Sequence, residues 1–230
     1  MTLKSTEQAL LEIPMRIGGR YGEATWPAAL AVVVAIVLQL LLPQKLVPGV
    51  RWLLPALEVV LLIPLALGTR HRHFEEAAWA RWLSIALISL ATLASLYSLV
   101  MLASTLIHGG KAGGHDLFLA AIDIWLTNVA IFGLWYWELD RGGPGARTYP
   151  EMEKPPEFLF PQMQNPSIAP RNWAPVFFDY LYVSLTNAAA FSPTDTMPLS
   201  LRAKGLMAVQ SIASLLTVAL VAARAVNILT

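Results

Sequence analysis

The feature that most constrains this chain is a series of apolar runs long enough to cross a lipid bilayer as helices. A hydrocarbon core of about 30 Å requires roughly 20 residues at helical rise. Four runs are plain and two more follow a polar stretch: residues 27–43, 52–69, 82–107, 117–138, 173–191 and about 200–229. Only helices or closed barrels satisfy the backbone in lipid, and these runs lack the alternation of barrel strands. The sequence therefore predicts an all-α, polytopic membrane helix bundle.

Composition supports a membrane protein and narrows its chemistry. Hydrophobic residues make up 56% of the chain and charged residues only 13%, well away from the globular average. The chain has no cysteine, which removes disulfides and thiolate chemistry. Its four histidines fall in two separate loops, and no catalytic triad, paired-carboxylate motif or zinc-binding helix is visible. We therefore expect no enzyme, no metal, no cofactor and no nucleic-acid partner.

The apolar runs and the polar stretch divide the chain into four parts. We expect an N-terminal interfacial segment, a four-span bundle, an extramembrane loop and a C-terminal helix-turn-helix membrane module, at residues 1–26, 27–140, 141–173 and 174–230. The loop is crowded with proline, glycine and charge, which disfavours regular helix. Its "FLFPQM" stretch offers an apolar anchor for the membrane surface or a neighbouring subunit. A plain surface loop is the favoured interpretation.

The simplest topology has about six spans: five spans and a further segment, at 174–191, that either spans or re-enters. If it spans, eleven Lys and Arg residues lie on the side of the long loop and five on the other. The positive-inside rule then places that loop and both termini in the cytoplasm. We expect a multi-pass protein of the cell inner membrane whose first partner is the lipid bilayer.

The stretch "SLTNAAAFSPTDTMPLSLR", residues 184–202, resembles a pore loop in length but lacks the glycines of a carbonyl filter. Such a filter needs left-handed backbone angles, which alanine and phenylalanine resist. We therefore interpret "NAAAF" as a helix end and "SPTDTMP" as a turn. Asn187 and Asp195 are the candidate turn residues.

The C-terminal quarter is similar to the signature of a family of uncharacterised bacterial inner-membrane proteins, a domain-of-unknown-function family. The matching positions are Asp179, Tyr182, Ser184, Asp195, Arg202, Val226 and Asn227. A weaker resemblance, carried by "SLT", the loop length, "PL" and a basic residue, is to the potassium-channel pore module with a degenerate filter. The first resemblance implies a multi-span membrane protein without indicating its activity.

Polar residues within the apolar runs are costly in lipid and are therefore candidates for function. On the last run Gln210, Ser214, Thr217 and Arg224 form one helical stripe. This stripe lines a pore or serves as a packing seam between helices, and packing is slightly favoured. We expect Arg224 to extend to the interface.

Three acids lie inside the expected spans, Glu58, Asp123 and Asp179. Glu58 stands between two prolines and either carries a proton or cation, pairs with an arginine, or faces water near the helix entrance. Asp123 begins a weaker polar group with Thr127 and Asn128.

For Asp179 we predict an ion pair with Arg224. At the end of the fourth run, "LWYWELDRGG" predicts an interfacial anchor with Glu138, Asp140 and Arg141 at the surface.

Two functional classes fit these patterns. The first is a channel-like or transport protein for a small ion or solute, assembled as a homo-oligomer and without a potassium-selective filter. The alternative is a non-transporting structural or partner-binding membrane component. The sequence alone separates them poorly.

Overall fold

The structure is a computed structural model of the 230-residue chain. It describes residues 26–42, 46, 55–56, 59, 74–108, 114–148, 154–165, 167, 169–170, 173–192 and 195–229. Within these ranges the side chains of residues 74–80, 114, 148 and 224–229 are not described. The expected second span, with Glu58, lies almost entirely outside the described residues.

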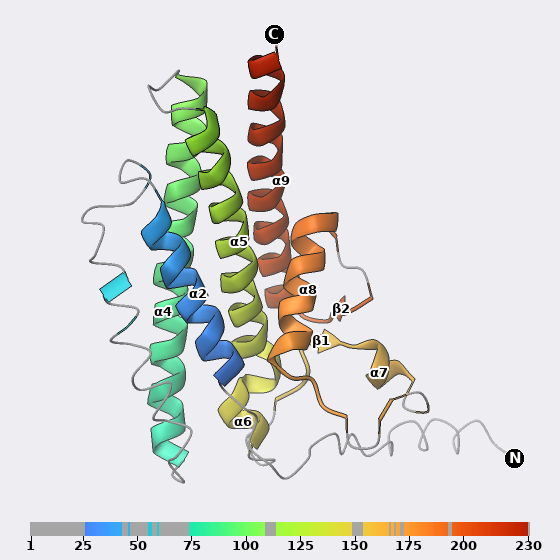
Figure 1. Cartoon of the computed structure of the whole chain (residues 1–230). Helices are drawn as coiled ribbons and strands as arrows, with labels where there is room; N and C mark the ends of the chain where they lie inside the picture. The colour runs from blue at the N-terminus through green and yellow to red at the C-terminus, as the bar shows by residue number, and fades with distance from the viewer. Residues whose placement is uncertain are drawn as a thin grey trace, which may run out of the picture.

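Five of the described helices form a bundle in which α5 is central and contacts each of the other four (Figure 1). These helices are α2 (Trp26–Leu41), α4 (Phe74–Ile107), α5 (Gly114–Leu139), α8 (Phe177–Ala190) and α9 (Leu201–Leu229). Short elements close one end of the bundle: η2 (Asp140–Gly142), α6 (Pro144–Thr148), β1 (Phe158–Leu159), α7 (Pro161–Gln164) and β2 (Met197–Pro198). The two strands pair antiparallel, with Phe158 opposite Pro198. The described chain is thus mainly helical, as predicted.

Three helical segments are long and apolar enough to cross a membrane: Arg81–Ile107, His115–Gly142 and Leu201–Ala223. They correspond to three of the predicted runs, and α2 is a shorter apolar helix. Helix α8 has only 14 residues, or about 21 Å at helical rise, which is short of a bilayer core. The structure therefore supports a helical membrane protein but does not show six spans.

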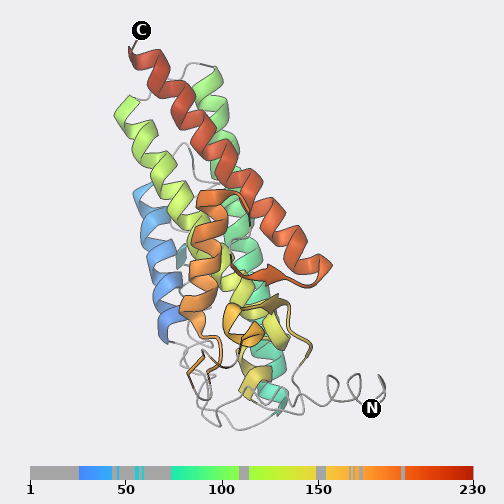
Figure 2. The ribbon, with the colours of Figure 1, turned by 90° about the vertical axis from the view of Figure 1, so that its right-hand side faces the viewer.

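The directions of α8 and α9 differ from those that a full span at 174–191 requires. Ser184 on α8 bonds the Val129 carbonyl and Phe177 contacts Trp137, so α8 runs antiparallel to α5. Helix α9 also runs antiparallel to α5, since Gln210 bonds Tyr136 and its later turns pack near the start of α5. The two helices therefore run in the same direction (Figures 1 and 2). Two consecutive spans would have to run in opposite directions.

The closed end of the bundle, which we call the cap, comprises the described residues from Asp140 to Trp173 together with β2. Phe158 and Phe160 of the "FLFPQM" stretch are 0% and 3% exposed and belong to the main hydrophobic core. Both short helices of the cap begin at a proline, the position at which proline's missing N–H is harmless. The preference for a plain surface loop was therefore wrong, because the aromatic side chains hold this segment against the chain's own helices.

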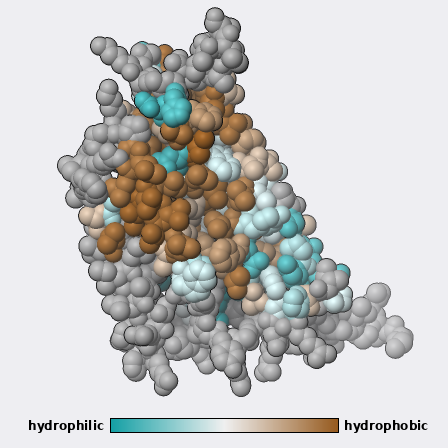
Figure 3. Space-filling model, viewed as in Figure 1, coloured by the Kyte–Doolittle hydropathy of each residue, from teal (hydrophilic) through white to brown (hydrophobic). Residues whose placement is uncertain are grey.

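The surface divides in the same way as the fold. Apolar residues predominate over the middle of the bundle in Figure 3, and hydrophilic residues gather near α7 and the two strands. On the outer sides of α4 and α9, Leu93, Val100 and Ile212 are each about 60% exposed. Large exposed apolar surfaces suit lipid rather than water. The apolar bundle thus fits the bilayer, with the cap at one end.

Candidate functional site

Two buried polar clusters occupy the interface of α5 and α8, one in the helix bundle and one under the cap. We call the first the amide cluster; it consists of Tyr136, Ser184, Asn187 and Gln210, each at most 1% exposed. These residues come from three helices, α5, α8 and α9. The cluster includes Gln210 from the predicted polar stripe and Asn187 from the predicted turn.

Every polar side-chain group of the amide cluster has a partner. The Gln210 Oε1 atom accepts hydrogen bonds from Tyr136 Oη at 2.5 Å and Asn187 Nδ2 at 2.8 Å. Gln210 Nε2 donates to the Ser184 carbonyl and hydroxyl, and that hydroxyl donates to the Val129 carbonyl at 2.7 Å. A fully paired network in a low-dielectric interior fixes the helices around it. Asn187 lies within α8 and not in a turn, so its predicted position was wrong.

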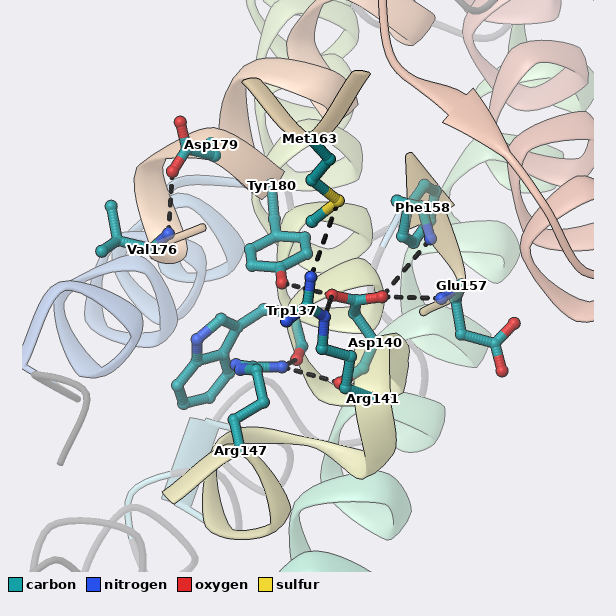
Figure 4. Close-up of polar contacts among 10 residues, drawn as sticks. All are labelled: Trp137, Asp140, Arg141, Arg147, Glu157, Phe158, Met163, Val176, Asp179 and Tyr180. Atoms are coloured by element: carbon teal, nitrogen blue, oxygen red, sulfur yellow. Dashed lines mark hydrogen bonds and ion pairs between the residues drawn. The ribbon is translucent and has the colours of Figure 1, made fainter. Parts of the chain in front are cut away.

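The second cluster is centred on Asp140, whose side chain is fully buried (Figure 4). Its Oδ1 atom accepts from the backbone N–H of Glu157 at 2.7 Å and of Phe158 at 3.3 Å. Its Oδ2 atom accepts from the Tyr180 hydroxyl at 2.7 Å. One carboxylate thus joins the end of α5, strand β1 and helix α8.

Two arginines complete the Asp140 cluster. Arg147 donates to the carbonyls of Trp137 and Asp140, each at 2.8 Å, and its guanidinium lies over the Trp137 and Tyr180 rings. Arg141 pairs with the Asp140 carboxylate at 3.6 Å and is 4% exposed. The predicted surface positions of Glu138, Asp140 and Arg141 were wrong, since all three are buried. Glu138 pairs with Arg81 of α4 at 3.6 Å, so each of the two buried acids has an arginine beside it.

The backbone after Asp140 turns sharply through three left-handed residues. Arg141, Gly142 and Gly143 have φ of 53°, 88° and 91°. Glycine adopts these angles without strain, whereas arginine does so at a cost. This turn ends α5 and directs the chain into the cap, where the Arg141 side chain contacts the Asp140 carboxylate and the Met163 sulfur.

Away from the cap, buried polar atoms on α5 and α9 lack a hydrogen-bond partner among the described residues. They belong to Asp123, Thr127 and Asn128 of α5 and to Ser214 of α9. Thr217, by contrast, donates to the Ala213 carbonyl of its own helix at 2.8 Å. The side chains of Gln210, Ser214 and Thr217 are at most 2% exposed. Within one chain the polar stripe of α9 therefore faces the bundle interior.

The far end of α8 forms a third feature, which we call the α8 tip: Ala189, Ala190, Phe191, Ser192 and Asp195. Residues Ala188–Ala190 are helical, as "NAAAF" predicted, and Phe191 caps the helix with a φ of 56°. All five residues of the tip are exposed. From Asp195 the chain returns to the cap, where Met197 pairs with Leu159.

The α8 tip lies within the depth of the apolar bundle. Ser184 is level with Val129, so Ala190, six residues further on, is level with the region of Asp123 on the antiparallel α5. This level is about 8 Å beyond the centre of the apolar segment His115–Gly142 at helical rise. Helix α8 therefore enters from the cap end, passes the middle, stops inside the apolar bundle and turns back.

The predicted ion pair between Asp179 and Arg224 does not fit this arrangement. Asp179 lies in the first turn of α8 at the cap end, where its Oδ2 atom accepts from the Val176 backbone N–H at 2.7 Å (Figure 4). An acid at this position is a common helix-start device. Position 224 lies near the other end of the bundle, because α9 runs parallel to α8; the Arg224 side chain is outside the described residues.

Sequence reasoning missed Tyr136, Tyr180, Arg147 and the burial of Asp140. The composition of "LWYWELDRGG" fits an interfacial aromatic belt as well as it fits a buried cluster. The tyrosine hydroxyls were the one signal of burial, because a buried tyrosine usually has a hydrogen-bond partner. Within the described ranges no group of three His, Asp or Glu residues could hold a metal ion. Glu58 lies outside those ranges.

Comparisons with known proteins add no relative to this description. No protein-family model, no curated protein and no solved structure matches the chain.

Proposed function

We propose that this chain forms a channel-like transport protein for small cations, with its permeation path along the α8 tip. The observation that carries the proposal is the course of α8, which stops within the apolar bundle and is followed by a return to the cap whose described residues Phe191, Ser192 and Asp195 are non-helical and exposed. Irregular backbone at membrane depth is tolerated where protein covers it or where it lines a water-filled cavity. The chain thus forms a spanning helix (α5), a half-helix (α8), a return to the cap and a second spanning helix (α9). The potassium-channel pore module has the same order of elements.

The electrostatics of the tip favour cations over anions. The last carbonyl groups of a helix lack intrahelical donors and carry a partial negative charge. The C-terminal end of α8 therefore presents this charge where the chain turns back. Asp195 adds an exposed carboxylate to the same segment. Half-helix C-termini at mid-membrane are known sites of cation coordination in transporters.

The proposal excludes strong selection of potassium over sodium. A dehydrating filter requires a row of backbone carbonyls in left-handed or alternating geometry. Ala188–Ala190 are helical, so their carbonyls point along the helix, and among the described residues of this stretch only Phe191 adopts a left-handed angle. Permeant ions would therefore keep much of their hydration, and potassium and sodium should pass at similar rates.

The test is cation flux into proteoliposomes, compared with empty vesicles of the same lipid. We expect flux above the empty-vesicle rate and a several-fold decrease for Asp195→Asn. The matched control is Asp116→Asn, which removes an exposed acid in the first turn of α5 and should leave flux unchanged. Equal flux with wild type and empty vesicles would refute transport, and strong potassium selectivity would refute the hydrated path.

A second candidate is a non-transporting membrane component. The amide cluster favours it, because Gln210 and Asn187 are fully used in joining helices. Polar residues in a membrane protein then serve packing. Absence of flux from a correctly folded, membrane-inserted protein would favour this candidate.

A further inference from the structure

Asp123 is a buried acid well inside the apolar segment of α5. Its side chain is 7% exposed, and the segment that contains it begins eight residues earlier, at His115. At helical rise Asp123 lies about 8 Å from the centre of that segment, within a hydrocarbon core of about 30 Å. An ionised carboxylate at this depth needs a positive partner. The described Lys and Arg side chains do not supply one, because all of them lie at the cap end: Arg81, Arg141, Arg147, Lys154, Arg202 and Lys204.

Asp123 and Thr127 lie on the side of α5 that faces α2. Leu134, Thr127 and Asp123 are spaced by seven and four residues and therefore share one side of the helix. Leu134 lines a cavity together with Val32 and Ala35 of α2. Asp123 Oδ2 and Thr127 Oγ1 are buried and have no hydrogen-bond partner among the described residues. Two oxygens on adjacent turns of one helix side can therefore accept a ligand from the same place.

The C-terminal end of α2 reaches the same level. Helix α2 begins at the cap end and runs antiparallel to α5, and Ala35 is about level with Ile131, since both line one cavity. Helix α2 ends six residues later, at Leu41, and thus between the levels of Thr127 and Asp123. Figure 1 shows α4 and α5 continuing beyond this end. The end of α2 carries partial negative charge, and its last turn contains no basic residue.

We propose that Asp123, Thr127 and the C-terminal end of α2 form a binding site for one monovalent metal cation of the sodium type. The carboxylate supplies the balancing charge, and the Thr127 hydroxyl supplies a neutral oxygen. Gln39, four residues after Ala35 on α2 and 7% exposed, brings a side-chain amide to the same level. Hard cations prefer oxygen ligands, and helix C-termini within membranes coordinate sodium in transporters.

The charge of the site favours a monovalent ion over a divalent one. One carboxylate and one sodium ion leave the site neutral, whereas a divalent ion would leave an uncompensated positive charge in an apolar interior. In the part of the chain that the structure describes, no further acid or histidine joins Asp123 in a metal-binding group of three. The site depends on the packing of α2 against α5 and does not rest on transport along the α8 tip.

Equilibrium binding of radioactive sodium to the purified protein tests the site. We expect one sodium ion per wild-type chain. Asp123→Asn and Thr127→Val should each lower the affinity by more than about tenfold, because loss of groups that merely orient ligands already costs about 10–100-fold. The matched control is Asp116→Asn on the same helix, since the Asp116 side chain is 67% exposed, and it should bind sodium as wild type does. Absence of sodium binding by the wild type, or equal binding by Asp123→Asn, would overturn the proposal.

Thermal unfolding in sodium and in N-methylglucamine, at equal ionic strength, provides a second measurement. At a hundredfold excess over Kd, sodium should raise the wild-type Tm by roughly 5–10 °C, and Asp123→Asn should show no such rise. If neither protein responds to sodium and Asp123→Asn is the more stable, a proton neutralises the carboxylate and the cation site is refuted. Sodium binding without flux would reject only the proposed function, and flux by a protein that binds no sodium would reject only this site.

Discussion

Replacing Asp140 by alanine should be the most destabilising single change in the cap. The substitution removes the acceptor of three hydrogen bonds, from Glu157 N, Phe158 N and the Tyr180 hydroxyl. It also removes the partner of Arg141, which is 4% exposed. These donors would stay buried without an acceptor, because Phe158 and Tyr180 are fully buried.

The magnitude follows from the number and burial of these partners. A hydrogen bond to a charged group contributes about 1.5–3 kcal/mol, but bonds that share one carboxylate are not additive. Breaking a buried charge network by removing one member typically costs about 3–5 kcal/mol. We therefore expect Asp140→Ala to lower the free energy of unfolding by about 4 kcal/mol. For a chain of this size that corresponds to a decrease in Tm of roughly 8–16 °C.

Unfolding in mixed micelles, followed by tryptophan fluorescence, measures this decrease. Tyr180→Phe, which removes a single donor, should cost about 1.5–3 kcal/mol. Asp116→Ala is the matched control, because the Asp116 side chain is 67% exposed, and should change stability by less than about 0.5 kcal/mol. If Asp140→Ala costs no more than Asp116→Ala, the carboxylate does not hold the cap, and the reasoning fails.

Three further predictions follow from the same contacts. Asn187→Leu and Gln210→Leu should each destabilise the protein by about 1–3 kcal/mol, and the double variant by clearly less than the sum, since both side chains share one network; additive losses in a double-mutant cycle would contradict this. Burial raises the pKa of Glu157 above its usual 4.5, with Arg202 opposing and Asp140 reinforcing the shift. The raised pKa therefore stabilises the folded protein below pH 4.5, where Glu157 is protonated, and this stabilisation is lost as the pH rises through the folded-state pKa. Glu157→Gln cannot ionise, so its stability relative to wild type should increase over the same rise in pH. Parallel pH profiles of the two proteins would rule out the shift. Finally, a cysteine at Gly145 and one appended after α9 should react with an impermeant reagent from opposite sides of the membrane, and labelling of both from one side would contradict the parallel course of α8 and α9.

The last of these predictions revises the expected topology. Helix α2 begins at the cap end, where Trp26 contacts Phe178, and α9 ends at the opposite end (Figure 1). Arg202 lies at the start of α9 beside the cap, so it and Lys204 move to the side of the long loop while Arg224 moves away. The split of Lys and Arg changes from eleven against five to twelve against four. The positive-inside rule then predicts a cytoplasmic cap and opposite sides for the two ends of the described bundle.

The helices of the bundle were predictable because their cause is local. Lipid demands a continuous run of apolar residues with an internally bonded backbone, and the segments Arg81–Ile107, His115–Gly142 and Leu201–Ala223 meet that demand by composition alone. The end of α8 at "NAAAF" was equally local, since the run of apolar residues stops before a sequence that contains two prolines.

Only the tertiary structure decided the direction of α8 and the burial of the Asp140 cluster. A hydropathy profile indicates the length of an apolar segment. Whether a short segment crosses the membrane or turns back depends on the contacts it makes, here Ser184 with Val129 and Tyr180 with Asp140. In a sequence, acids and arginines that follow a group of aromatic residues predict exposure to water at the membrane interface. Asp140 is buried here because its donors come from residues 17, 18 and 40 positions further along the chain. Pairing over these distances depends on the folded chain rather than on local composition.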